Sequence, residues 1–124
     1  EAIVAQRLAR RICSNCKEEF SPTEEMLLEL DLTPESTRGR SFMYGRGCDY
    51  CNNTGYRGRV GLFEIMALND EMRDLIMKHA STALLRNAAR KAGMSSLREN
   101  GLLAIYEGLS TIEEVVRETI VEEA

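Results

Sequence analysis

Several residue types and patterns that mark common functional classes are missing from this sequence. The chain has one histidine and no tryptophan, and aromatic residues make up only 6% of it. No apolar run approaches the roughly 20 residues that a membrane-spanning helix needs. No G-x-x-x-x-G-K-[S/T] phosphate-binding loop is present, and no nucleophile is paired with a general base as in a hydrolytic triad. These absences argue against a membrane span, a nucleotide-binding loop and hydrolytic catalysis within this stretch.

The composition is that of an ordinary water-soluble domain. The chain has 124 residues, of which 44% are hydrophobic and 29% are charged. A chain of this length buries about two-thirds of its unfolded surface, so one domain with a real core, or one domain plus an appendage, is expected. The net charge is −4, and it comes entirely from residues 63–124. The chain begins at Glu1 rather than Met, so it reads as a piece of a longer protein.

The four cysteines form two matched pairs, Cys13-Ser14-Asn15-Cys16 and Cys48-Asp49-Tyr50-Cys51. Two residues between the members of a pair let one tight turn direct both thiolates at the same point. Two such turns can close a tetrahedral shell of four sulfurs, which favours zinc, with iron as the competitor. A closed shell leaves no position for water or substrate. The spacing therefore predicts a structural metal site with no catalytic function.

The cysteine pattern leaves two other interpretations open. Four cysteines can form two disulfides in three connectivities, but no signal peptide is visible in this sequence to support a secretory route. The many charged residues and few aromatics resemble a cytosolic protein, in which thiols stay reduced. Each pair could also be a redox motif, but neither clearly opens a helix after a strand. The 31 residues between the pairs are more than in common zinc ribbons and imply a small insert.

Five arginines gather in the sequence around the second cysteine pair: Arg38, Arg40, Arg46, Arg57 and Arg59. A basic rim on a zinc ribbon can bind phosphate groups, so a stand-alone nucleic-acid-binding module is one alternative function. The negative net charge and the shortage of stacking aromatics oppose it. The rim could equally be solvated or paired with acidic neighbours.

Turn and cap signals divide the chain into short elements. We expect a helix from Ser21-Pro22-Thr23-Glu24, in which Ser21 is the cap and Glu24 completes a capping box. Its apolar face would be Met26, Leu27, Leu28 and Leu30, and it would end at residues 32–34. Strands are predicted at residues 42–44 and 59–65. Gly45 and Gly47 would permit the tight backbone that presents Cys48.

Residues 69–124 predict four helices whose apolar faces would form one shared core. Their starts are marked by Asn69, Ser81, Ser96 with Glu99, and the segment 110–113, and Gly93 is expected to end the second helix. His79 follows Lys78 at the end of the first of them, where we expect a surface or helix-end residue and not a metal ligand. The expected fold class is α+β and mainly α: a small Cys₄ zinc-knuckle lobe with short strands, followed by a helical tail of about four helices.

Three stretches together resemble a known family: AQRLARRICSNCKEEF, GCDYCNNTGYRGRVGLFEIM and LRNAARKAGMSSLRENGLLAIYEGLSTIEEVVRET. Over essentially the whole chain, the sequence is similar to the C-terminal part of the ATPases that assemble type IV pili or drive type II secretion. The resemblance implies that Cys13, Cys16, Cys48 and Cys51 bind zinc. Retraction-type relatives generally lack this tetracysteine lobe, so the resemblance favours assembly or secretion.

The resemblance also implies a division of the chain and a setting for it. Residues 1–12 would be the end of a RecA-like ATPase core, 13–58 the zinc lobe, and 59–124 a strand with the C-terminal helices. The Walker motifs would lie upstream, so ATP and Mg²⁺ would bind only the parent protein and this fragment would not be an enzyme. The parent would form a cytoplasmic hexameric ring at the inner membrane, with neighbouring subunits and the membrane platform protein as partners and no nucleic acid.

The expected role of the fragment is structural, with force transmission or docking to a partner. The resemblance does not separate pilus assembly from type II secretion, and we favour the pilus system by a small margin. The alternatives from other classes are the nucleic-acid-binding zinc ribbon and a thiol-disulfide redox protein.

Overall fold

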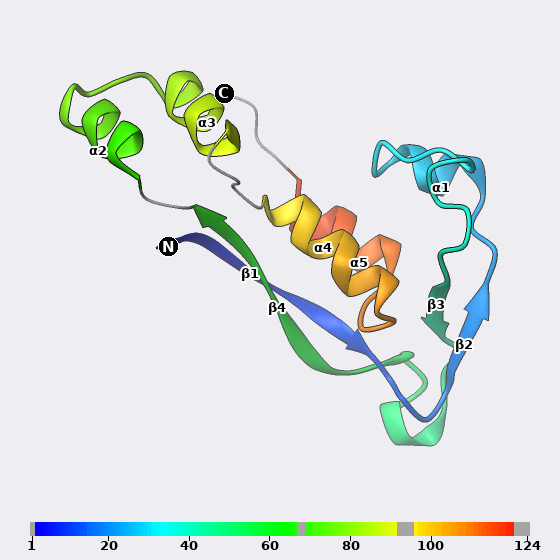
Figure 1. The fold of residues 1–124 in the computed structure, drawn as a ribbon. Helices are drawn as coiled ribbons and strands as arrows, with labels where there is room; N and C mark the ends of the chain where they lie inside the picture. The colour runs from blue at the N-terminus through cyan, green and yellow to red at the C-terminus, as the bar shows by residue number, and fades with distance from the viewer. Residues whose placement is uncertain (1, 67–68, 92–95, 121–124) are drawn as a thin grey trace.

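The computed structural model describes residues 2–66, 69–91 and 96–120, and Figure 1 shows how they are arranged. The elements in chain order are β1 (Ala2–Ile12), β2 (Lys17–Phe20), α1 (Glu24–Leu28), β3 (Phe42–Gly45), the 3₁₀ turn η1 (Asp49–Cys51), β4 (Tyr56–Met66), α2 (Asp70–Met77), α3 (Thr82–Lys91), α4 (Leu97–Tyr106) and α5 (Ile112–Glu118). The expected α+β class is confirmed, as are four helices after residue 69. No helix within the described ranges combines the length and apolar character that a membrane crossing requires.

The longest feature of the fold is an antiparallel ribbon of two strands, β1 and β4 (Figure 1). The pairing runs from Ala2 opposite Met66 to Ile12 opposite Tyr56, with two irregularities in register. Ala9 and Leu62 lie on the covered face and are fully buried. The predicted strand at 59–65 is confirmed and extends further at its start, to Tyr56. Residues 2–12 had no predicted structure, and the ribbon makes them the partner of β4.

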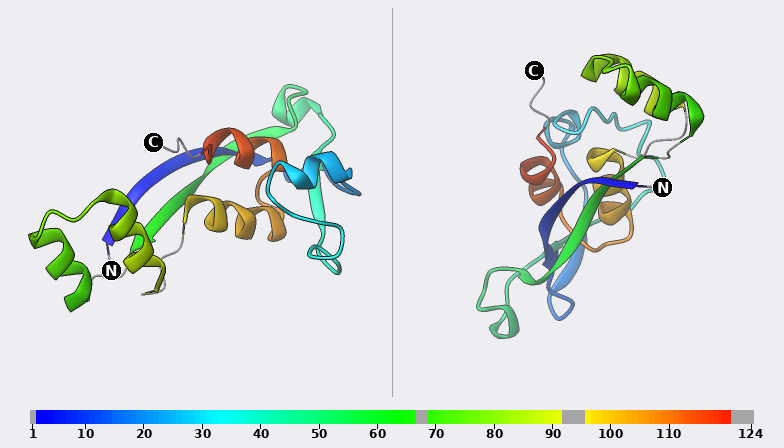
Figure 2. Two further views of the ribbon diagram at one scale, coloured as in Figure 1. Left: turned by 90° about the horizontal axis from the view of Figure 1, so that it is seen from above. Right: turned by 90° about the vertical axis from the view of Figure 1, so that its left-hand side faces the viewer.

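The second sheet is a short antiparallel pair, called here the β2–β3 hairpin although residues 21–41 and α1 connect its strands. It is set at an angle to the ribbon (Figures 1 and 2). Its register pairs Lys17 with Gly45 and Phe20 with Phe42, which confirms the predicted strand near residue 42. Phe42 is buried and meets Tyr106 of α4 edge to face, with ring centroids 5.9 Å apart. The aromatic contact fixes the hairpin against α4.

Helix α1 is shorter than its predicted form and begins two residues later. Its cap is Thr23, not Ser21, because the Thr23 hydroxyl accepts the Met26 N–H at 3.2 Å. Glu24 and Glu25 then occupy the first turn, where negative charge suits the helix dipole. A single short turn can bury only one side, so Leu27 is buried while Leu28 is 63% exposed. The predicted apolar face that included Leu28 is therefore wrong at that residue.

The main core joins α4 and α5 to the ribbon, to α1 and to β3. Its buried members are Ala9, Leu27, Leu30, Phe42, Leu62, Ala104, Ile105, Ile112 and Val115. The two helices approach closely because Gly101 has no side chain: a Cβ there would lie 2.5 Å from a methyl group of Val115. Burying this apolar surface is the principal stabilising contribution to this part of the fold.

Helices α2 and α3 form a separate pair, which corrects the expectation of one shared helical core. Met72 and Ala88 make a small buried cluster of their own, with Met66, Leu75 and Leu85 against it. Figures 1 and 2 show the pair at the far end of the ribbon from the cysteine turns. Because two short helices cannot cover all their apolar side chains, three on them are at least 46% exposed: Ile76, Met77 and Leu84.

The helix starts follow the predicted caps closely. Asn69, Ser96 and Thr111 each accept a backbone N–H from the first turn of α2, α4 and α5. Ser110, which was grouped with the last cap, is instead buried and donates to the Arg10 carbonyl oxygen at 2.9 Å. His79 is exposed just after α2, as expected. Gly93 lies outside the described residues.

Candidate metal centre

The four cysteines lie where the two sheets meet. Cys13 directly follows β1 and Cys16 directly precedes β2, while Cys48 lies between β3 and η1 and Cys51 ends η1. Backbone bonds tie the two turns together: Cys13 N–H donates to the Gly55 carbonyl at 2.9 Å, and Arg46 N–H donates to the Cys16 carbonyl at 3.1 Å. Segments 31 residues apart in sequence thus form one compact knuckle.

The sulfur atoms are spaced for a single metal ion. All four Sγ atoms lie within 4.8 Å of one another. The Cys13–Cys48 and Cys16–Cys51 separations are both 3.8 Å, and Cys48–Cys51 is 3.7 Å. A tetrahedron with metal–sulfur bonds of about 2.3 Å has edges of about 3.8 Å. The thiol cluster therefore fits the soft-ligand, four-coordinate site that zinc prefers.

The same distances speak against the disulfide interpretation. A disulfide joins its sulfurs at about 2.05 Å. The measured separations of 3.7–3.8 Å are far longer, and all four cysteines are free thiols. Cys13, Cys16 and Cys51 are also at most 5% exposed, whereas a working redox pair needs an accessible thiolate.

Polar hydrogens converge on three of the sulfurs. Cys51 Sγ accepts the N–H groups of Gly55 at 3.2 Å and Cys48 at 3.4 Å. Cys16 Sγ accepts Gly47 N–H at 3.3 Å, and Cys48 Sγ accepts the Asn15 side-chain amide at 3.2 Å. Hydrogen bonds from amides stabilise thiolate over thiol. The knuckle is therefore prepared to carry the negative charge that a bound cation would neutralise.

The pKa directions agree with a cluster that needs a cation. The Asn15 hydrogen bond lowers the pKa of Cys48, against burial. Burial raises the pKa of Cys51, but the Cys48 and Gly55 amides outweigh it and bring the value to about 6. Burial raises the pKa of Cys16 to about 11, against the Gly47 amide. Adjacent thiolates repel one another when no cation lies between them, so a bound cation would favour the ionised form of the whole cluster.

Two glycines let the turns approach each other. A Cβ on Gly45 would overlap the Gly55 carbonyl, and Gly55 has a φ of +81°, which L residues rarely adopt. The approach brings the Gly55 N–H to Cys51 and its carbonyl to Cys13. The expectation that Gly45 permits a tight backbone is confirmed. Gly55 and Asn15 were missed as sulfur contacts, although a glycine four residues after Cys51 and an amide inside the first pair are local signals for them.

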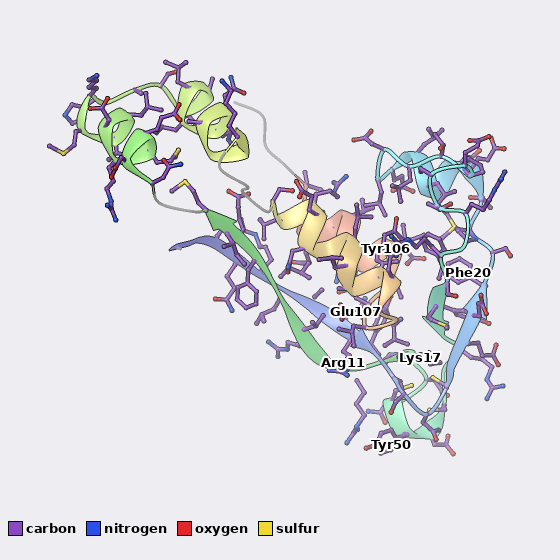
Figure 3. The ribbon with its side chains drawn as sticks, viewed as in Figure 1. Arg11, Lys17, Phe20, Tyr50, Tyr106 and Glu107 are labelled. Atoms are coloured by element: carbon purple, nitrogen blue, oxygen red, sulfur yellow. The ribbon has the colours of Figure 1, made fainter. Side chains whose placement is uncertain are left out.

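The arginines do not form one basic rim, which corrects the sequence interpretation. Arg40 lies over the Tyr106 ring of α4, 4.6 Å from its centroid, and Arg57 lies over Tyr50 at 4.0 Å. Arg46 pairs with Glu18 at 3.1 Å. Figure 3 shows Tyr106 well away from Tyr50, which marks the knuckle tip. The segment 33–41 turns back toward α1, so sequence proximity to Cys48 did not become spatial proximity.

Comparison with known proteins places the chain in a family. The family described as type II/IV secretion system protein matches residues 1–117. The chain is 43% identical over 118 residues to the type IV pilus assembly ATPase PilB of Myxococcus xanthus, covering 94% of this chain and 21% of that protein. It is 39% identical over 118 residues to the type IV pilus assembly ATPase PilB of Thermus thermophilus, covering 95% of this chain and 13% of that protein. It is 39% identical over 119 residues to type II secretion system protein E of Pseudomonas aeruginosa, covering 94% and 23%.

The chain belongs to the type II/IV secretion system protein family, as its sequence resemblance indicated. It spans between about an eighth and a quarter of the length of these relatives.

Proposed function

We propose that this chain is the metal-binding and helical part of an ATPase that powers type IV pilus assembly, with type II secretion as the alternative. In this proposal ATP and Mg²⁺ bind upstream in the parent protein, and the fragment carries out no chemistry. The parent works as a hexameric ring in the cytoplasm, held at the inner membrane by the platform protein. Some relatives are named as pilus assembly ATPases and others as type II secretion proteins, which supports the ATPase class. An experiment is needed to decide between the two systems.

The metal in this proposal is zinc, held by Cys13, Cys16, Cys48 and Cys51 as a structural ion. One observation carries it: four sulfurs within 4.8 Å of one another, three of them receiving amide hydrogens. Bound there, the ion would supply charge neutralisation and a rigid cross-link. The residues themselves set the shape: Gly45 and Gly55 bring the turns together, and the amides orient the sulfurs.

The mechanical role rests on how the knuckle is attached. Both strands of the ribbon lead into it, since β1 ends at Ile12 beside Cys13 and β4 begins at Tyr56, five residues after Cys51. Along this path the eleven-residue strands β1 and β4 are paired, and α4 and α5 pack against them, so hydrogen bonds and packing hold the path in place. A cross-link at its end would let a displacement from the upstream part reach the knuckle without local unfolding.

The test uses the full-length parent protein. Cys48→Ser should lower the zinc content from about one ion per chain and impair pilus assembly or secretion. The rate of ATP hydrolysis should fall much less, because the nucleotide binds elsewhere. Ser14→Ala, an exposed change in the same knuckle, is the matched control. Wild-type protein without zinc would overturn the metal site, and unchanged assembly after zinc loss would overturn the mechanical role.

Pilus assembly and type II secretion can be separated in cells. A strain lacking the parent protein should lose surface pili and keep its secreted enzymes if the pilus proposal holds. Complementation with the wild-type parent should restore the pili. Loss of secreted enzymes with normal pili would assign the protein to the secretion system instead.

A further inference from the structure

A groove lies between the β2–β3 sheet and the start of α5, next to the cysteine knuckle and distinct from its sulfur cluster. It has a volume of about 390 Å³ and is open to solvent. Nine residues from both sheets, α1, α5 and a loop line it: Phe20, Met26, Tyr44, Gly45, Thr54, Tyr56, Thr111, Ile112 and Glu113. The volume is within the range of ligand sites, and its open shape suits an extended chain segment better than an enclosed small molecule.

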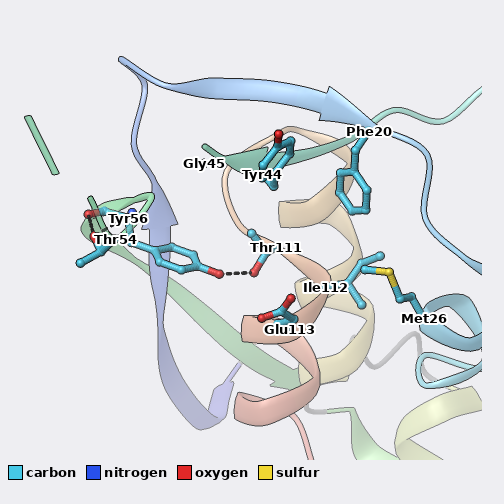
Figure 4. Close-up of a pocket in the computed structure, with 9 residues that line it drawn as sticks. All are labelled: Phe20, Met26, Tyr44, Gly45, Thr54, Tyr56, Thr111, Ile112 and Glu113. Atoms are coloured by element: carbon cyan, nitrogen blue, oxygen red, sulfur yellow. Dashed lines mark hydrogen bonds between the residues drawn. The ribbon is translucent and has the colours of Figure 1, made fainter. Parts of the chain in front are cut away.

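The groove has an apolar end and a polar end. Figure 4 shows Phe20, Met26 and Ile112 together at one end, and Tyr56, Thr111 and Glu113 toward the other. Tyr44 lies above, between the two ends. Two kinds of group are therefore needed in an occupant: an apolar side chain, and a polar group a few residues along the same chain.

The walls of the groove are held in place by contacts among the lining residues and by two residues outside it, Glu18 and Arg10. The Phe20 and Tyr44 rings pack edge to face at 5.6 Å, and the Tyr44 hydroxyl donates to Glu18 at 3.0 Å. The Tyr56 hydroxyl and Thr111 Oγ1 are 2.8 Å apart. The Arg10 guanidinium covers one side of the Tyr56 ring at 4.1 Å. A surface fixed in this way loses little conformational entropy when a partner binds.

The negative charge of Glu113 at the polar end of the groove favours a cationic group on the occupant. Glu113 is exposed, and among the described residues no Arg, Lys or His nitrogen forms an ion pair with it. Its neighbour Glu114, by contrast, is bound by Arg10 and Arg117. An aromatic ring beside a carboxylate is the surrounding that a guanidinium prefers, since it can stack on the ring and bind the carboxylate with two hydrogen bonds.

We propose that this groove docks a segment of a partner protein in which an arginine or lysine lies within a few residues of an apolar side chain. The apolar side chain would pack among Phe20, Met26 and Ile112, and the cation would sit beside Glu113. The inference rests on the proposed function in one respect, that the parent works against partner proteins. It does not require bound zinc or a particular export system.

The experiment is photocrosslinking in cells that produce the full-length parent. The photoreactive residue p-benzoylphenylalanine replaces Tyr44 in the groove wall or, as the matched control, Tyr50 at the knuckle tip, which is 55% exposed. Only the Tyr44 position should yield a discrete adduct. The adduct peptide should come from a different protein and carry Arg or Lys within about four residues of the linked site, since an extended chain covers about 3.3 Å per residue.

A second variant tests the charge. Glu113→Gln should lower the adduct yield about tenfold, because it removes the charge from the ion-paired hydrogen bond. Glu107→Gln, an exposed carboxylate at the end of α4 outside the groove, should leave the yield unchanged. No adduct, an adduct peptide without a basic residue, or no effect of Glu113→Gln would overturn the proposal. An adduct with a second copy of this chain would also overturn it and would identify an interface between copies. Zinc content is measured on each protein, so a failure of the metal site is recognised separately.

Discussion

The cysteine knuckle and the α4–α5 region are held together by different interactions. The buried cluster of the knuckle consists of Cys13, Cys16 and Cys51 with Cys48 beside them, and no other apolar side chain of the described residues joins it. Within the described ranges, the core under α4 and α5 contains nine buried apolar residues, which come from six helices and strands and from the turn after α1. A short loop pair cannot bury enough apolar surface to fold, so in the proposed function a bound metal would take the place of a core there.

The two regions are also joined, so their independence is a question for experiment. Ile12 N–H donates to the Leu109 carbonyl, and Ser110 Oγ donates to the Arg10 carbonyl, both at 2.9 Å. The turn between α4 and α5 is thus bonded to the end of β1, next to Cys13. Phe42 and Leu27, which lie between the cysteine pairs in sequence, belong to the α4–α5 core. We therefore expect that loss of the metal would unfold only the two cysteine turns and leave the α4–α5 core folded.

The largest effect is expected from loss of the metal. Cys51→Ser should abolish zinc binding, because Cys51 is 5% exposed and receives two amide hydrogens. Zinc contributes roughly 10–16 kcal/mol in small zinc-binding peptides. Hydrogen exchange should then show residues 13–16 and 46–56 opening, while α4 and α5 stay protected. Ser14→Ala should retain zinc and protection. Loss of protection throughout the chain would mean that the two regions unfold as one unit.

The converse change removes part of the apolar core. Ile105 is 1% exposed, and Ile105→Ala should reduce the free energy of unfolding by about 2–5 kcal/mol through the cavity it leaves. Zinc content should stay at about one ion per chain. Denaturant unfolding and elemental analysis on the same sample give both quantities. Leu103→Ala in the same helix, at 55% exposure, should cost far less. Zinc loss in the Ile105 variant would show that the knuckle depends on this core.

An intermediate effect is expected at the polar link between the ribbon and α5. Glu114 is 1% exposed and accepts Arg10 N–H at 2.8 Å and Arg10 Nε–H at 2.9 Å, with Arg117 also bound to it. Burial raises the pKa of Glu114, but these partners outweigh it and hold the pKa below its ordinary value. Glu114→Gln should cost about 1–3 kcal/mol at pH 7, because the buried donors lose their charged acceptor.

The sign of the pH dependence follows from that lowered pKa. The folded state binds the Glu114 proton less readily than the unfolded state, so the stabilisation is full above the ordinary pKa of about 4.3 and is lost as the pH falls through the lower folded value. Acid also protonates the cysteines, so the quantity to measure is the difference between wild type and Glu114→Gln at each pH. That difference should shrink between about pH 5 and pH 2. A difference that is constant over this range would contradict the ionised role.

Local signals in the sequence predicted the parts of the fold that local interactions determine. The caps at Asn69 and Ser96 were identified, and the last cap was placed within residues 110–113, because one side chain and one N–H three residues later make each of them. The cysteine pairs were identified because their spacing already defines two turns. The convergence of all four sulfurs followed from the geometry that a tetrahedral site requires.

Apart from the sulfur cluster, features that depend on distant partners were not predicted. Strand β1 pairs with β4 some fifty residues away, and its sequence mixes apolar and basic residues because one ribbon face is covered and the other is exposed. The groove combines Phe20, Tyr56 and Ile112, which no local pattern connects. The α2–α3 pair is separate from α4 and α5 because it lies at the far end of the ribbon, where β4 ends. An amphipathic pattern identifies a buried face but not the element that covers it.

The smallest effect is expected from an exposed ion pair beside the cysteine turns. Its removal tests whether contacts other than the metal stabilise the knuckle. Arg46 bonds Glu18 at 3.1 Å, but their side chains are 63% and 43% exposed. Exposed pairs contribute about 0–1 kcal/mol, because water screens them and both side chains lose freedom. Arg46→Ala should therefore change the free energy of unfolding by less than about 1 kcal/mol and leave zinc bound. Raising the salt concentration should reduce even this difference. A larger loss, or release of zinc, would mean that the Arg46 side chain supports the turn carrying Cys48, and the knuckle would then depend on more than its sulfurs and amides.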